Sequence, residues 1–378
     1  MPTVRDTSIS IAKGLAIIAV VIGHSGAPGN LSYLMYAFHM PLFFITAGYF
    51  FNLKYLGQEG TFVRRRFKGL YVPFVKWSLV FLLLYNLWFK LGVMNEQYGN
   101  SGGGLLHPYS FHALLQNAVS ICANMSGYDV CLGGAFWFFR ALLVASIAFL
   151  FYYKFLTRFK LSAEWTTLLV CLTALSAAIL LTAFRLRVTG LPQGGYRDLM
   201  GLFYFGLGFL YRNRGHLLKR GKWYACTIVC AAILAAWCRW RLPVGMPFTA
   251  AGTSAIFLSM PPAIAGFLLI HRLSAWIDRH DTRLRQFLVY CGDNTLYVFI
   301  FHFAVFKPVN LLKIMWYGMD YSRMGYYPVI HEHTDDWFWL VYTLAGTAIP
   351  LLWIYGYRKL KNRLQTCKNA APNRCTGL

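Results

Sequence analysis

Two ionisable residues stand inside the first apolar segment of the chain, where a lipid-facing surface should carry no charge. Lys13 and His24 are eleven residues apart, close to three helical turns, so both project from one face of a helix. They lie about 16 Å apart along that axis. Ionisable groups at membrane depth usually line a protein interior or a wet cavity, which makes this face a candidate functional site. The alternative is that Lys13 snorkels to the interface and His24 only ends the helix.

The composition indicates that this helix belongs to a membrane protein. Of the 378 residues, 57% are hydrophobic and only 13% are charged, which predicts an all-α, polytopic transmembrane helical bundle rather than a soluble globule. About ten apolar segments are long enough to span a membrane: residues 9–25, 35–53, 70–90, 134–153, 164–184, 198–211, 223–240, 249–271, 287–308 and 337–357. No internal repeat separates them, so residues 1–378 are expected to form a single transmembrane domain.

The distribution of basic residues predicts the orientation. A net charge of +23 would suggest a nucleic-acid partner in a soluble protein, but here the basic residues fall in short clusters between apolar segments, as topology signals do. Most of these clusters lie on one side of the alternating segments, and that side is expected to be cytoplasmic, together with both termini. The two longest connections, about 91–133 and 309–336, then lie outside and are candidates for covering an acceptor site.

This topology predicts that three histidines meet at one depth. His24 lies near the outer end of the first segment, His39 enters from the same level, and His302 lies about fifteen residues into the ninth segment, also near the outer side. Arg140 falls in the outer part of the fourth segment. At the inner level the chain gathers its cations: Lys13, Arg64, Arg65, Arg66, Lys68 and Lys76.

The same residues carry a family resemblance. The opening of the chain resembles that of the acyltransferase family 3 membrane proteins in Lys13-Gly14, Gly23-His24, Phe38-His39-Met40-Pro41-Leu42-Phe43-Phe44 and Ala47-Gly48-Tyr49. Three later blocks agree: Arg64-Arg65-Arg66 before Pro73, Phe136-Trp137-Phe138, and Gly292-Asp293-Asn294-Thr295-Leu296-Tyr297 running up to His302. The resemblance implies a multi-pass protein of the plasma (bacterial inner) membrane that moves acyl groups, commonly acetyl from acetyl-CoA, onto sugars of envelope polysaccharides.

The resemblance and the charges together suggest roles for these residues. The expected ligands of the acyl-CoA phosphates are Lys13, Arg64, Arg65 and Arg66, because arginine binds phosphate bidentately and lysine binds it as a point charge. The expected catalytic residues are His24, His39 and His302, and the expected acceptor-binding residues are Arg140 and Trp137. His24 suits a general base or a transient acyl carrier, and direct transfer and an acyl-enzyme both stay open.

Each of these roles has a structural alternative. A run of arginines also occurs simply as a positive-inside topology signal. A histidine among aromatic residues is often only a hydrogen-bonded residue of the core. The chain also departs from the family pattern. Lys13 stands where an arginine is common, Ser10 stands where an aspartate is common, with Asp6 one turn earlier, and Gly69 replaces the second cation before Pro73.

Other functions and partners are weighed in the same way. A transporter or flippase for a lipid-linked sugar or polysaccharide also needs many spans and buried ionisable groups, but it would show two matching halves with broken helices, which the sequence lacks. Membrane lipids, acyl-CoA and a glycan acceptor are the expected partners. No CxxC or Cys/His spacing suggests a metal, and the oligomeric state is not predicted. Cys122 and Cys131, in an outer connection, are candidates for a disulfide.

Overall fold

The computed structural model describes residues 6–99, 107–128, 130–189, 191–214, 223–246 and 252–370. Across these residues the chain is helical, with turns and loops between the helices and no strand, which confirms the all-α prediction. The helices in chain order are α1 (Thr7–His24), α2 (Gly29–Tyr49), α3 (Glu59–Arg66), α4 (Val72–Lys90), α5 (Phe111–Asn124), α6 (Val130–Gly133), α7 (Trp137–Leu156), α8 (Ala163–Ala183), α9 (Tyr196–Arg214), α10 (Trp223–Trp240), α11 (Thr253–Ile277), α12 (Arg283–Asp293), α13 (Thr295–Tyr317) and α14 (Phe338–Ala370).

The membrane-spanning segments correspond closely to the predicted ones. Within the described ranges, nine helices are long and apolar enough to cross a membrane. The remaining predicted segment, 198–211, forms α9, whose first turn carries Arg197 and Asp198 and lowers its hydropathy. This helix packs against α2, α7 and α8 inside the bundle, so the protein rather than lipid surrounds it. The chain is therefore a multi-pass helical membrane protein.

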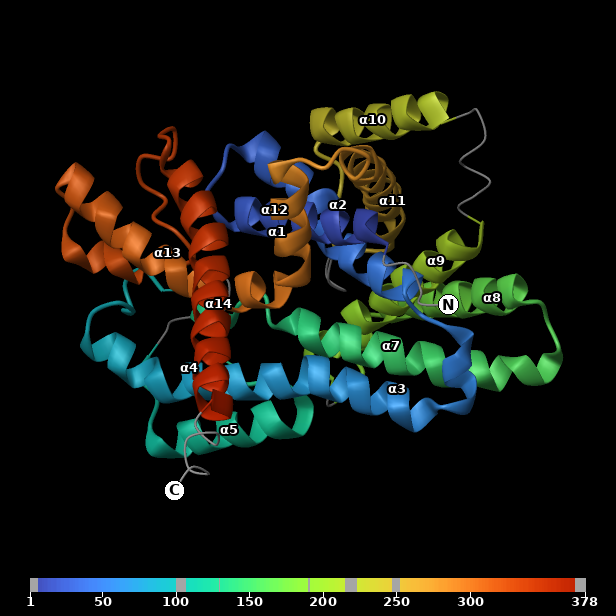
Figure 1. The fold of residues 1–378 in the computed structure, drawn as a ribbon, viewed down its shortest axis with the longest axis horizontal. Coiled ribbons are helices and arrows are strands. Elements are labelled where there is room, and N and C mark those ends of the chain that lie inside the picture. The colour runs from blue at the N-terminus through green and yellow to red at the C-terminus, as the bar shows by residue number, and fades with distance from the viewer. Residues whose placement is uncertain are drawn as a thin grey trace, which may run out of the picture.

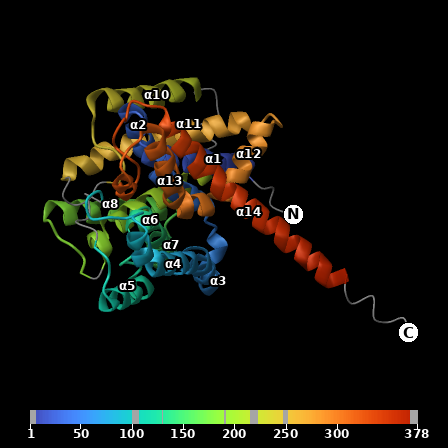
Figure 2. The same ribbon diagram turned by 90° about the vertical axis from the view of Figure 1, so that its left-hand side faces the viewer.

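One long helix forms an edge of the bundle (Figure 1). α3 and α4 join through a π-helical turn, η2 (Phe67–Tyr71), into a continuous helix of 32 residues, Glu59–Lys90. At 1.5 Å per residue it is about 48 Å long, which exceeds a hydrocarbon core of about 30 Å. α7 lies alongside it, and Lys154 at the end of α7 pairs with Glu59 at 2.6 Å. Figure 2 shows α14 leaving the bundle, and residues 355–365 of this helix are exposed.

The expected outer loop 91–133 contains a helix that the sequence analysis missed. α5 runs back along α4, because Asn86 exchanges hydrogen bonds with the backbone of Tyr109 at 2.8 Å each way and the Tyr71 hydroxyl donates to the carbonyl of Cys122 at 2.6 Å. At 14 residues it is too short to span a membrane. Its exposed face carries three large apolar side chains that suit contact with lipid, Phe111, Leu115 and Val119, beside the polar His112 and Gln116.

The ninth span is not continuous as predicted, whereas the candidate disulfide between Cys122 and Cys131 stays a prediction. Cys122 is exposed, and the side chain of Cys131 lies outside the described residues. The ninth segment, 287–308, is interrupted: α12 ends at Asp293 and α13 begins at Thr295. His302 therefore lies about two turns into α13, whereas an unbroken helix would have placed it about four turns in.

Two glycines of the family-like motifs allow α1 to touch α12. A Cβ atom added at Gly14 would overlap the carbonyl oxygen of Leu288, and one added at Gly292 would overlap that of Ser10. Small residues let helix backbones approach closely, as they do in membrane-helix pairs. This contact fixes the height and rotation of α1, which carries both Lys13 and His24.

We predict that Gly292→Ala destabilises the protein, because the added methyl group forces two backbones apart. Overpacking of this kind typically costs about 1–3 kcal/mol, so the midpoint of thermal unfolding in detergent should fall. Gly60→Ala is the matched control, since no atom lies within 4 Å of an added Cβ there and alanine favours the helix. Equal midpoints for the two variants would contradict the contact between α1 and α12.

Candidate active site

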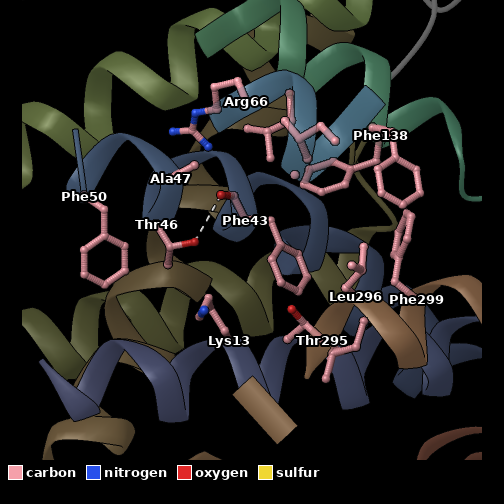
Figure 3. Close-up of a pocket in the computed structure, with 15 residues that line it drawn as sticks. Lys13, Phe43, Thr46, Ala47, Phe50, Arg66, Phe138, Thr295, Leu296 and Phe299 are labelled. Carbon is pink, nitrogen blue, oxygen red and sulfur yellow. Dashed lines mark hydrogen bonds between the residues drawn. The ribbon is translucent and has the colours of Figure 1, made fainter. Parts of the chain in front are cut away.

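A cavity of about 310 Å³ lies where five helical elements meet. α1, α2, the long α3–α4 helix, α7 and α13 all contribute to its walls (Figure 3). Its polar side chains are Lys13, Thr46, Arg66 and Thr295, and the other lining residues are apolar or glycine. An apolar pocket with a few convergent polar groups is the usual form of a small-molecule site.

The two cations reach this cavity from opposite sides. Figure 3 shows Arg66 on one side and Lys13 on the other. The guanidinium of Arg66 lies over the rings of Phe62 and Phe205, at 5.0 and 5.9 Å from their centroids, and these contacts hold it against the bundle. The lining also includes Gly69, so the position that lacks the family's second cation borders this space.

The other two arginines of the run do not line the cavity. Arg64 and Arg65 are exposed, and Arg65 donates a hydrogen bond to the Tyr55 hydroxyl at 2.9 Å. The helical rotation of 100° per residue explains this split, because consecutive side chains cannot share one face. Of the four expected donor ligands, the structure therefore brings together Lys13 and Arg66.

The three predicted histidines do meet. The rings of His24 and His302 are stacked with centroids 5.7 Å apart. His39 joins them through Tyr36, whose ring lies 5.1 Å from His39 and 5.6 Å from His24. His39 and His302 are buried, whereas His24 is half-buried. Within the part of the chain that the structure describes, no group of His, Cys, Asp and Glu side chains is arranged to hold a metal ion.

Hydrogen bonds define how these imidazoles present their nitrogens. Nδ1 of His39 lies 2.6 Å from the carbonyl oxygen of Met35, and Nδ1 of His302 lies 3.0 Å from those of Val298 and Phe299. Carbonyls only accept, so Nδ1 donates in both rings and Nε2 holds the lone pair. In His302 this Nε2 is buried and has no hydrogen-bond partner among the described residues. An unprotonated Nε2 is the form that a base or nucleophile requires.

Tyr36 was not singled out from the sequence. Its hydroxyl lies 3.0 Å from Nδ1 of His24, so it fixes the orientation of the most accessible imidazole. The signal was present in the sequence, because Tyr36 precedes His39 by three residues and shares its helical face. A tyrosine in an aromatic-rich chain carries no distinguishing mark, however, until its partner is known.

An aromatic wall separates the cavity from the imidazoles. Phe299 lines the cavity, and its ring centroid lies 6.4 Å from that of His302. On the cavity side it packs against Phe138 and Phe139 at 5.6 and 5.3 Å. The cation-bearing space and the imidazole cluster are thus neighbours along α13 that share a side chain.

Arg140 and Trp137 lie elsewhere. Arg140 forms a buried ion pair with Asp198 at 2.9 Å and donates to the carbonyl of Pro192 at 3.0 Å. The Trp137 ring lies under the guanidinium of Arg197, 4.0 Å from its centroid. Neither predicted acceptor ligand lines the cavity, and their role in acceptor binding stays a prediction. Asp198 could not be paired with Arg140 from the sequence, since the two are 58 residues apart.

The connection after α13, residues 318–337, packs next to the imidazole cluster. Lys307 donates to the carbonyls of Val93, Met324 and Tyr326 at 3.1, 2.8 and 2.9 Å, which ties this connection to α13 and to the end of α4. The ring centroid of Tyr327 lies 5.3 Å from that of Phe303, and the ring centroid of Phe303 lies 4.1 Å from that of His302. We refer to residues 318–337 as the cap.

Asp6 supports the opposite end of α1. Its carboxylate caps the helix by accepting from the Ile9 amide at 3.4 Å, and it also accepts from Ser8 at 2.6 Å and from the Tyr49 hydroxyl at 2.8 Å. Burial raises the pKa of this carboxyl, but the hydrogen bonds outweigh that effect and hold the pKa below its ordinary value. Asp6 therefore stays ionised and joins α1 to the end of α2, although it does not line the cavity.

The fold and the site define a multi-pass membrane protein with a cation-lined cavity next to a histidine cluster, which is an arrangement suited to group transfer. A family model described as an acyltransferase domain matches residues 6–359. The chain belongs to this family, acyltransferase family 3, and is a membrane acyltransferase. It is 22% identical over 340 residues to nodulation protein NolL of Mesorhizobium japonicum, an alignment that covers 82% of this chain and 79% of that protein. No solved structure gives a significant match.

We predict that the Arg140–Asp198 pair is energetically coupled. Arg140→Met leaves a buried carboxylate without its partner, which typically costs about 3–5 kcal/mol, whereas replacing both charges with apolar groups is often nearly neutral. The double variant Arg140→Met/Asp198→Leu should therefore unfold at a higher temperature in detergent than Arg140→Met alone. Losses that simply add in the double variant would show that the two groups act independently.

Proposed function

We propose that the protein moves an acyl group, most simply acetyl, from acyl-CoA on the cytoplasmic side to a hydroxyl of an envelope polysaccharide or lipid-linked sugar on the outer side of the bacterial inner membrane. The observation that carries this proposal is the shared wall at Phe299. Lys13 and Arg66 face one side of it, and the cluster of His24, His39 and His302 lies on the other.

The cavity suits the thioester end of the donor. Its apolar walls fit an acyl group and the arm that bears it, while Lys13 and Arg66 supply positive charge where a phosphate or a carbonyl dipole would lie. At about 310 Å³ the cavity is at the small end of ligand sites, so the nucleotide part of coenzyme A would remain outside it. The exposed Arg64 and Arg65 are available to that part.

The imidazoles suit the acceptor side of the reaction. In direct transfer, His24 removes the proton from a sugar hydroxyl, the hydroxyl oxygen bonds to the thioester carbon, and the carbon–sulfur bond breaks. The thiolate then takes up the proton, so that an ester and free coenzyme A leave the site. The same overall reaction can proceed in two steps through an acyl-imidazole intermediate, in which the acyl group passes from the thiol to a histidine and then to the sugar hydroxyl. Nε2 of His302, which has no hydrogen-bond partner among the described residues, is the atom best placed to form this intermediate.

The second candidate is transport or flipping of a lipid-linked sugar. It needs a path that opens alternately to the two sides around a central site. In the described part of the chain, the cavity next to Lys13 instead ends on packed phenylalanine rings. The membership of an acyltransferase family also favours chemistry over transport.

We predict that Arg66→Ala and Arg65→Ala have different effects on donor use. Of these two arginines, only Arg66 lines the cavity. Its loss should raise the KM for acetyl-CoA about 10-fold or more, because the variant loses one charge-assisted hydrogen bond to the donor. Arg65→Ala removes an equal charge from an exposed position and should leave the KM nearly unchanged. The assay measures label passing from acetyl-CoA to de-O-acylated envelope glycan by purified protein. Equal effects would indicate general electrostatic attraction rather than a built site.

We predict that His24→Ala lowers kcat by about 10²–10⁴, the range for loss of a general acid–base group, without changing the KM for acetyl-CoA. His112→Ala is the control, since His112 is exposed on α5 far along the chain from the cluster. Transfer that continues at the wild-type rate in His24→Ala would remove His24 from the mechanism.

We predict that Tyr36→Phe keeps the ring contacts with both histidines but loses the hydrogen bond to His24. A bond of this kind is worth about 1–1.5 kcal/mol, which corresponds to a roughly 10-fold fall in kcat. The KM for acetyl-CoA should not change, because Tyr36 does not line the cavity. A wild-type kcat in this variant would mean that the orientation of His24 does not depend on the hydroxyl.

A further inference from the structure

We propose that Phe299 selects the acyl group: its ring closes the cavity against His302, so that only a short acyl chain passes from the donor cavity to the imidazoles. This inference rests on the proposed function and adds to it the class of donor, a short-chain acyl thioester, and the residue that enforces it.

The ring of Phe299 packs against four other aromatic rings beside the cavity that it lines. Its centroid lies 5.6 Å from Phe138, 5.3 Å from Phe139, 6.4 Å from Phe136 and 6.4 Å from His302, and the residue is 5% exposed. Side chains packed at this density accept extra methylene groups only with strain. A donor whose acyl end reaches this wall therefore meets a limit on its length.

The ring of Phe299 lies between the donor cavity and the histidine cluster, so it obstructs the path that acyl transfer requires. The thioester carbon enters from the side of Lys13 and Arg66, while the base that activates the hydroxyl lies with His302 and His24. The two can meet only if the ring of Phe299 moves aside or if the acyl group is small enough to pass its edge. In Figure 3, Phe138 and Phe299 lie together at one end of the cavity, away from the two cations.

The backbone of Phe299 allows such a movement without disturbing the base. Its carbonyl oxygen accepts a hydrogen bond from Nδ1 of His302, as does that of Val298. These bonds hold the imidazole through main-chain atoms of α13, and a change of side-chain rotamer at Phe299 leaves them in place. Size selection and orientation of the base are thus separable functions of one residue.

The test compares donors of increasing length, acetyl-, butyryl- and hexanoyl-CoA, with de-O-acylated envelope glycan as acceptor. Each methylene excluded by a packed wall is worth about 10-fold or more in kcat/KM. Phe299→Ala should raise the butyryl-to-acetyl ratio of kcat/KM at least 10-fold and should increase thioester hydrolysis without acceptor, measured as released thiol. Phe299→Trp should lower kcat/KM for acetyl transfer at least 10-fold, because the larger ring narrows the passage.

Phe74→Leu is the matched control, because Phe74 is also buried and packs against Phe136 and Phe139 rather than against Phe299, and it does not line the cavity. It should keep the wild-type ratio. If Phe299→Ala fails to fold, as judged by its elution in detergent, Phe299→Leu replaces it with the same expected direction. An unchanged ratio in the folded small-residue variant, beside a wild type that transfers acetyl, would overturn this inference alone. A wild type that uses none of the three donors would overturn the proposed function, and the selection by Phe299 with it.

Discussion

A charged group inside a membrane bundle must be enclosed by protein and given a polar partner or a ligand, and this requirement organises the whole structure. α1 carries two such groups, with Lys13 in its first half and His24 at its end. The contact of Gly14 with Leu288 and of Gly292 with Ser10 turns that face of α1 inward. The cavity and the histidine cluster can form only because this rotation is fixed.

The ionisable groups of the bundle lie in two kinds of surroundings. Arg140 is paired with Asp198, and Lys307 donates to three backbone carbonyls. Lys13 and Arg66 line a cavity of about 310 Å³. Hydropathy alone does not distinguish these two kinds of surroundings.

The sequence predicted the helical class, the positions of most spans and the meeting of three histidines, because period, hydropathy and alternation of sides are local properties. It did not predict α5, whose half-apolar pattern in a polar connection resembles a loop, or the break at Asn294 that shifts His302 along α13. It also could not separate Arg66 from Arg64 and Arg65, or pair Arg140 with Asp198. Those distinctions depend on helix rotation and on contacts between distant segments, which hydrophobic patterning does not encode.

The uninterrupted helix from Glu59 to Lys90 mechanically couples two distant parts of the molecule. Arg66 lies near its beginning, while just beyond its end Asn95 donates to Ser322 at 2.6 Å and the carbonyl of Leu91 accepts from Tyr321 at 3.0 Å, both in the cap. This one stiff helix therefore links a wall of the cavity to the cap beside the histidine cluster. Because helices respond to bilayer thickness by tilting, a thinner or thicker membrane would displace both ends together and couple catalysis to lipid composition.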